Sequence, residues 1–189
     1  MISMIHFEFI SASADNEEIR WALIQTRRQL SEKRGLLCFS LDWKNPVQWS
    51  HYADRHRGLC IDFDVPEADV SRVVYVSQRE TIDREKLMSD GLPFMDRMMR
   101  TKFKHWSYER EVRMFVNLEQ PDQKSGLYFK SFCKNLQVTD VIVGVNSDIS
   151  RTELNRALGS LADSVKCKKA RLAFRTFKVV EQRKASLWS

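Results

Sequence analysis

Two carboxylates separated by one residue are the clearest candidates for chemistry in this chain. Glu109 and Glu111 flank Arg110, and Arg113 follows two residues later. In a strand, alternate side chains point to the same face, so the two carboxylates and the Arg113 guanidinium would share one surface at intervals of roughly 7 Å. One carboxylate could bind a sugar hydroxyl and stabilise positive charge developing on a ribose carbon. The alternative is that these side chains are exposed and form cross-strand ion pairs of little energetic value.

A second group of candidates lies on a short helix that the sequence predicts over residues 46–54. Asn45 can cap this helix, and Pro46 can occupy its first position, where a missing N–H costs nothing. Its aromatic side is made of Trp49, Tyr52 and His56, with His51 near the edge. Aromatic side chains at this spacing are typical of a core, whereas a tyrosine ring beside a cleft could stack on a nucleobase or a nicotinamide. Both interpretations stay open for Trp49 and Tyr52.

Cysteine and histidine side chains around this helix suggest two further chemistries. The residues concerned are Cys38, His51, His56 and Cys60. Their spacing fits no common zinc module, so we predict no metal site. A nucleophilic pair such as Cys60 with His56 would need an exposed thiol with a lowered pKa, whereas Cys60 lies in a strand-like run. We therefore expect free thiols that pack as small hydrophobes.

The length and composition of the chain favour one domain. Its 189 residues are 43% hydrophobic, which suffices for one core and is too little for two independent ones. No run approaches the roughly 18 apolar residues that cross a bilayer, and the N-terminus lacks the pattern of a signal peptide. We expect a single domain over residues 1–189, without membrane contact, in the cytoplasm.

The positive charge of the chain favours an acidic partner. The formal net charge is +6 and the isoelectric point is near 9.2. Lysine and arginine concentrate in residues 97–113 and 166–184. Because excess positive potential attracts nucleic acid, these segments are candidate nucleic-acid surfaces. The alternative is a solvated face that serves solubility alone.

The spacing of apolar residues predicts the elements that would position these side chains. Helices are predicted at residues 15–33, from 90 or 93 to 104, and at 150–161, where Ser150 and Glu153 form a capping box. Strand patterns occupy residues 36–40, 59–63, 73–76, 109–116, 127–132, 138–145 and 170–180. This order predicts an α+β fold with a mostly antiparallel, split β-sheet flanked by helices.

Several short motifs together resemble a widespread bacterial family of uncharacterised domains. They are Cys38-Phe39-Ser40, Trp49-Ser50-His51-Tyr52-Ala53-Asp54 with His56 and Gly58, Phe63-Asp64, Trp106, Tyr108-Glu109-Arg110-Glu111-Val112-Arg113, and Val141-Ile142-Val143-Gly144. The combination is specific and spans about residues 35–145. The family has no settled activity, so this resemblance implies a grouping without a mechanism.

The order of the same motifs also resembles the ADP-ribosyltransferase fold. In that fold a strand ending in a Phe-Ser-like pair precedes a helix whose aromatic ring stacks on nicotinamide, and a later strand opens with Glu-x-Glu. The resemblance implies that Glu111 binds the nicotinamide-ribose hydroxyl of NAD and stabilises an oxocarbenium-like transition state, with Ser40 helping to hold the site. It implies that Glu109 and Arg113 orient an acceptor. The nicotinamide side of the site would comprise Tyr52, Trp49 and His51.

One departure from that fold concerns its first strand, where an Arg or His grips the adenosine side of NAD. Here only the segment from Ile5 to Ile10 corresponds, with His6 as a substitute. The uncharacterised family usually begins with an aromatic-rich strand and an Asn-Asp-Pro-like loop, and neither is visible here, so we expect a chain shortened at its N-terminus relative to that family. The leading hypothesis is an enzyme of bacterial defence or stress that uses NAD to modify a nucleic acid or a protein. The alternatives are a non-catalytic module that binds nucleic acid or protein, and a hydrolase or nuclease that depends on a divalent ion.

Overall fold

The computed structural model of the chain describes residues 10–12, 17–82 and 84–188. The chain divides into two compact units: unit 1 comprises residues 1–41 and 67–131, and unit 2 comprises residues 42–66 and 132–189. The predicted role of His6 lies outside the described residues. Each unit is presented by itself below, and the expected single domain stays a prediction.

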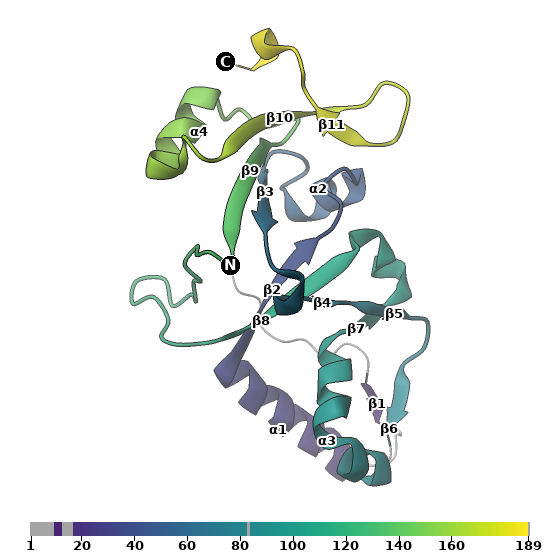
Figure 1. Ribbon diagram of the computed structural model, residues 1–189. Helices are drawn as coiled ribbons and strands as arrows, with labels where there is room; N and C mark the ends of the chain where they lie inside the picture. Colours follow the sequence, from purple (N-terminus) through teal and green to yellow (C-terminus); the bar gives the residue numbers. More distant parts are fainter. Residues whose placement is uncertain (1–9, 13–16, 83, 189) are drawn as a thin grey trace. The chain divides into compact units, whose positions relative to one another are not determined.

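Unit 1 is built on a three-stranded antiparallel sheet with the order β2-β8-β4 (Figure 1). Strand β8 (Glu111–Asn117) lies between β2 (Arg34–Ser40) and β4 (Ser71–Arg72). The register places Ser40 opposite Glu111 and Cys38 opposite Arg113. Because directly opposed side chains point to the same face, these four side chains share one side of the sheet.

Two parallel strand pairs and two helices complete unit 1. The strand pairs are β1 (Ile10–Ala12) with β6 (Glu80–Ile82), and β5 (Val74–Val76) with β7 (Thr101–Phe103). Helices α1 (Glu17–Lys33) and α3 (Arg84–Met99) pack through an apolar cluster of Ile19, Leu23, Phe94 and Met98. The helix predicted to reach residue 104 ends at Met99, since the next residues leave it to pair with β5.

Unit 2 contains a four-stranded sheet with the order β11-β10-β9-β3. Its strands are β3 (Leu59–Asp64), β9 (Gln137–Val143), β10 (Lys166–Leu172) and β11 (Val179–Glu181). Strand β9 runs parallel to β10, and the other two pairings are antiparallel. Ile142 packs with residues of α2 (Pro46–Tyr52), whereas its neighbours Val141 and Val143 pack with Leu154 of α4 (Arg151–Leu158). The sheet of unit 2 is therefore covered on both faces.

The predicted α+β class with mostly antiparallel strands is confirmed, because four of the seven strand pairings in the described residues are antiparallel. Short 3₁₀ helices occupy Glu67–Asp69, Lys104–Glu109, Gly159–Leu161 and Ala185–Leu187. The capping box of Ser150 and Glu153 is present. Within the described residues, no helix is both long and apolar enough to cross a membrane.

Two strand predictions were wrong. Residues 127–132 form no strand, and Leu127, Phe129 and Phe132 are exposed there. The single strand predicted over residues 170–180 is instead the antiparallel pair β10 and β11, joined by a turn that closes with a hydrogen bond from Ala173 N–H to Lys178 O at 2.9 Å. The turn interrupts the apolar pattern because Phe174 and Phe177 point into solvent.

Candidate functional site

Four charged side chains of unit 1 meet in one buried group, which we name the charge cluster: Lys102, Glu109, Glu111 and Arg113. The Lys102 ammonium lies 2.5 Å from Glu109 Oε2 and 3.0 Å from Glu111 Oε2. Both glutamates are almost fully buried, with 5% and 6% of their surface exposed. The alternative in which these carboxylates are exposed ion pairs is therefore wrong.

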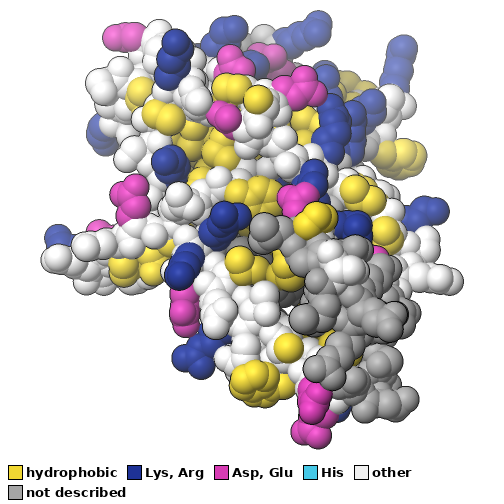
Figure 2. All heavy atoms as spheres, turned by 60° about the horizontal axis from the view of Figure 1, so that its bottom comes forward, with side chains coloured by type: hydrophobic (Ala, Val, Ile, Leu, Met, Phe, Trp, Pro, Cys, Tyr) yellow, Lys and Arg dark blue, Asp and Glu magenta, His cyan; other side chains and the backbone are white. Residues whose placement is uncertain are grey.

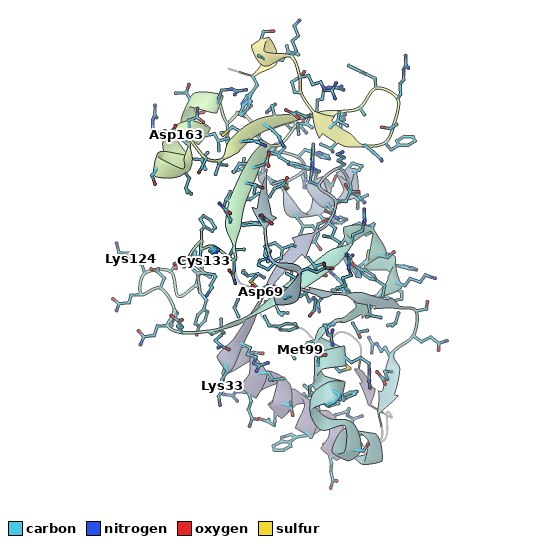
Figure 3. The ribbon with its side chains drawn as sticks, in the orientation of Figure 1. Lys33, Asp69, Met99, Lys124, Cys133 and Asp163 are labelled. Atoms are coloured by element: carbon cyan, nitrogen blue, oxygen red, sulfur yellow. The ribbon has the colours of Figure 1, made fainter. Side chains whose placement is uncertain are left out.

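Arg113 holds the second carboxylate of the charge cluster from the other side. Its Nε donates to Glu111 Oε1 at 2.7 Å, and its Nη2 lies 3.4 Å from Glu111 Oε2. Its third nitrogen, Nη1, donates to the Met99 carbonyl at 2.5 Å. Figure 3 labels Met99 in α3, whose last residue it is. The carbonyl at the end of α3 therefore orients the Arg113 guanidinium, and the guanidinium in turn orients the Glu111 carboxylate.

The backbone brings the two carboxylates together by a different route from the one predicted. Glu109 ends a 3₁₀ helix rather than opening the strand, and Arg110 adopts a left-handed conformation with φ of 48°. The Ser40 hydroxyl donates to the Glu109 carbonyl at 2.7 Å and Leu41 N–H to the Arg110 carbonyl at 3.2 Å, which ties this turn to the end of β2. The two carboxylates thus converge on Lys102 from a turn and a strand.

Glu111 and Lys102 are both charged at neutral pH. Burial raises the pKa of Glu111, but hydrogen bonds and charge from Arg113, with Cys38 and Lys102, outweigh burial and leave the pKa below its ordinary value of 4.5. Burial lowers the pKa of Lys102, but its contacts with Glu109 and Glu111 outweigh this and raise the pKa above 10.5. The cluster therefore holds an ionised carboxylate in a water-poor environment.

Three residues that were not predicted as site residues complete this site. Lys102 lies on β7, directly beside Tyr75 of β5 in the parallel register. The Tyr75 hydroxyl accepts a hydrogen bond from the Glu111 backbone N–H at 2.8 Å. The Lys102 ammonium also lies 5.1 Å from the centre of the Trp106 ring. Pairing of the distant strands β5 and β7 brings Tyr75 beside Lys102, which local spacing does not reveal. Trp106 belongs to the 3₁₀ helix that directly follows β7.

Cys38 is the exposed neighbour of the buried carboxylate. It belongs to β2, opposite Arg113, and its thiol faces Glu111. Although the residue as a whole is exposed, its thiol is largely shielded from water. This desolvation, together with the nearby Glu111 carboxylate, raises the pKa of Cys38 to about 12. The thiol is therefore protonated at neutral pH, which makes it a weak hydrogen-bond donor to Glu111 and a poor nucleophile.

Helix α2 of unit 2 carries the residues predicted to bind nicotinamide. Asn45 caps it through Oδ1, which accepts from Val47 N–H at 2.9 Å. Trp49 is 3% exposed, packs in the core and donates its indole N–H to the Trp43 carbonyl at 2.6 Å, which favours the core interpretation of this ring. Its role in nicotinamide stacking stays a prediction. Tyr52 is 65% exposed, and its role and that of the neighbouring His51 stay predictions.

The turn after α2 explains the motif that surrounds these aromatic residues. Asp54, Arg55 and His56 all have left-handed conformations, with φ of 41°, 53° and 68°. The His56 carbonyl accepts from Asn146 N–H at 3.0 Å, and the Gly58 carbonyl accepts from Gly144 N–H at 2.9 Å. The motif thus docks the end of α2 onto the end of β9.

The described residues include no group of three or more Cys, His, Asp or Glu side chains placed to hold a metal. Burial and the nearby Asp62 carboxylate raise the pKa of Cys60 to about 12, which opposes a thiolate at this position. The neighbouring His56 instead has Nε2 at 3.2 Å from the Ser50 hydroxyl. The nucleophilic pair of Cys60 with His56 is therefore wrong.

Comparison with known proteins places part of the chain in one group. Residues 48–114 match a family described as "Protein of unknown function (DUF2971)". The match begins in α2 and ends in β8, so it takes in the turn after α2 and the charge cluster. No curated protein and no solved structure matches the chain. Residues 48–114 are therefore similar to a family of unknown function, in agreement with the resemblance that the motifs indicated.

Proposed function

We propose that the chain is an NAD-using enzyme that works as ADP-ribosyltransferases do, with Glu111 stabilising positive charge on the ribose. The observation that supports this proposal is the state of Glu111, which is buried yet ionised between Arg113 and Lys102. A carboxylate fixed in a low-dielectric site stabilises a nearby cation more strongly than one in water.

The proposed reaction breaks the bond between ribose C1′ and the nicotinamide nitrogen. The bonding electron pair leaves with nicotinamide, which becomes neutral, and positive charge develops on the ribose. Glu111 stabilises this oxocarbenium-like carbon. An oxygen or nitrogen of the acceptor then bonds to C1′ and releases its proton to solvent, with Glu109 and Arg113 proposed to orient the acceptor.

The position of Cys38 is where a substrate hydroxyl could reach the buried Glu111 carboxylate. Glu111 already accepts three N–H groups, from Lys102 and twice from Arg113. Its remaining neighbour is the Cys38 thiol, a poor donor that a ribose hydroxyl could replace. Ser40 follows on the same face of β2 and is exposed, which suits its proposed part in holding the sugar.

A second candidate function is a binding module without catalysis. The observation that favours it is the same set of hydrogen bonds: the carboxylate of Glu111 is occupied by cations of its own unit. In that case the charge cluster would hold β7 beside β8 through the contact of Lys102 with Glu111, as buried ion pairs do in some proteins.

Release of nicotinamide from NAD by the purified chain tests the proposal. We expect release that falls roughly 100-fold or more in Glu111→Gln, which keeps the shape of the side chain and removes its charge. Glu119→Gln, at an exposed carboxylate just beyond β8, serves as the matched control and should retain full activity.

Circular dichroism establishes whether the Glu111→Gln variant is folded. If it is not, Cys38→Ala is the second test, since it opens the path to Glu111 while all three N–H contacts remain; we expect a changed KM for NAD. Absence of nicotinamide release with both nucleic-acid and protein acceptors, or equal release by wild type and a folded Glu111→Gln, would overturn the proposal and favour the binding module.

A further inference from the structure

Two phenylalanines in the turn between β10 and β11 are almost entirely exposed. Phe174 is 93% and Phe177 98% exposed. The turn that carries them is held by the Ala173–Lys178 hydrogen bond and by the pairing of β10 with β11. Exposed aromatic rings on an ordered turn point to an interaction, because the chain gains nothing from them in isolation.

A groove of about 530 Å³ lies beside this turn, entirely within unit 2. One part of its lining comes from the turn and includes Phe174. Another part is the segment Trp43–Lys44, which precedes α2. The Lys44 carbonyl accepts a hydrogen bond from Val179 N–H of β11 at 2.9 Å, and this bond fixes the segment against the strand pair. The groove therefore has two walls with an aromatic ring in each.

The groove is strongly basic. Lys44, Arg171, Arg175 and Arg183 line it, against one carboxylate, Glu181. The Arg171 guanidinium lies 4.9 Å from the centre of the Phe174 ring and the Lys44 ammonium 5.9 Å from that of Trp43, so each aromatic ring of the lining has a cation beside it. In Figure 2, Lys and Arg side chains gather at the upper right of the face shown.

Several other cations of the two basic segments have partners within their own unit. Arg97 pairs with Glu80 and Arg100 with Asp96, while Lys102 and Arg113 belong to the charge cluster. On β10, Lys168 pairs with Asp140 and Lys169 donates to the Ser147 carbonyl at 2.7 Å. These six cations are therefore partly neutralised by neighbours in their own unit. The proposal below rests on the cations that line the groove.

We infer that this groove binds single-stranded nucleic acid. Phosphates would lie against Arg171, Arg175 and Arg183, and bases would stack on Phe174 and Phe177. Stacking needs the open face of a base, which a single strand offers and a duplex hides. The groove also argues against a membrane as the ligand, because a concave site with rings in both walls fits separate bases better than a bilayer surface. This inference is independent of the proposed NAD chemistry, since every residue involved lies in unit 2.

Fluorescence anisotropy with a labelled 12-nucleotide single strand, as DNA and as RNA, tests this inference on the full chain. We expect tighter binding to the single strand than to a duplex of the same sequence. Phe174→Ala and Phe177→Ala should each weaken binding roughly 5- to 100-fold, since stacking contributes that much per base. Arg175→Gln should lower the slope of log affinity against log salt by about 0.7 for the phosphate contact it removes.

Matched controls lie at the opposite end of the unit 2 sheet from the turn. Phe132→Ala removes an exposed ring that precedes β9, and Arg156→Gln removes an exposed cation of α4, which leads into the start of β10. Both should bind like the wild type. Unchanged binding in the Phe174 and Phe177 variants overturns the inference, as does tighter binding to anionic phosphatidylserine vesicles than to the oligonucleotide.

Discussion

At the scale of single residues, the sequence predicted part of the charge cluster, the shared face of Glu111 and Arg113, but not the contacts of Lys102. The spacing of Glu111 and Arg113 indicated a shared face, and Arg113 does contact Glu111 from that face. Lys102 was not predicted as a site residue, because its contact with both carboxylates depends on how β7 and the following 3₁₀ helix are placed in the fold. The position of Glu109 depended on the left-handed backbone of Arg110, which the sequence did not indicate.

Removing Lys102 should destabilise unit 1 strongly. Lys102→Met would remove the ammonium that contacts both buried carboxylates, and breaking a buried ion pair in this way costs about 3–5 kcal/mol of the free energy of unfolding. Urea denaturation measures this loss. Adding Glu109→Gln should restore part of the stability, because it removes one of the two carboxylates that Lys102 contacts.

The exposed pair of Arg28 with Glu32 on α1 provides the control for this experiment. Arg28→Met should change the free energy of unfolding by less than about 1 kcal/mol. A loss of that small size in Lys102→Met would show that the charge cluster contributes nothing through its pairing.

At the scale of elements, local signals predicted helices better than strands. Asn45 with Pro46 and Ser150 with Glu153 mark helix starts that the structure confirms, since capping depends on neighbouring residues alone. Residues 127–132 have a strand-like composition but no partner strand in the described part of the chain, so they stay irregular. Strand formation needs pairing with distant residues, which periodicity does not report.

The contact between the turn after α2 and the end of β9 should not tolerate a side chain at Gly144. A Cβ there would lie 2.2 Å from the His56 carbonyl oxygen and 2.8 Å from the Gly58 carbonyl oxygen. Because both atoms belong to the backbone, Gly144→Ala should cost roughly 1–3 kcal/mol or more and lower the melting temperature.

Gly126→Asn is the corresponding control. Its added Cβ would meet nothing within 4 Å, and its φ of +68° is one that asparagine adopts with little strain. A melting temperature for Gly144→Ala close to that of Gly126→Asn would mean that the turn moves away freely and that the docking contributes little.

At the scale of the whole molecule, each of the two units is formed by two separate segments of the chain. Unit 2 begins at residue 42, is interrupted by residues 67–131 of unit 1, and resumes at residue 132. Residues 67–131 of unit 1 therefore begin and end at segments of unit 2, and unfolding of unit 2 would free both ends of this stretch. The composition that predicted one domain could not reveal this arrangement, since it depends on which distant strands pair.

We expect unfolding in a single cooperative transition. Hydrogen exchange measured by mass spectrometry in increasing urea should show peptides from β8 and from β9 losing protection at the same concentration. Separate transitions for the two strands, with midpoints that differ beyond the error of measurement, would contradict the single-domain prediction.

The interleaved order of the segments also limits how this protein can be dissected. The matched stretch, residues 48–114, contains β3 without its partner β9 and most of its last strand, β8, without β2. A fragment cut at those limits would expose two unpaired strand edges, and Trp49 and Phe94 would each lose core residues that they pack with. Family boundaries drawn from sequence similarity are therefore poor guides to expression limits here, and soluble pieces are better sought by substitution in the intact chain than by truncation.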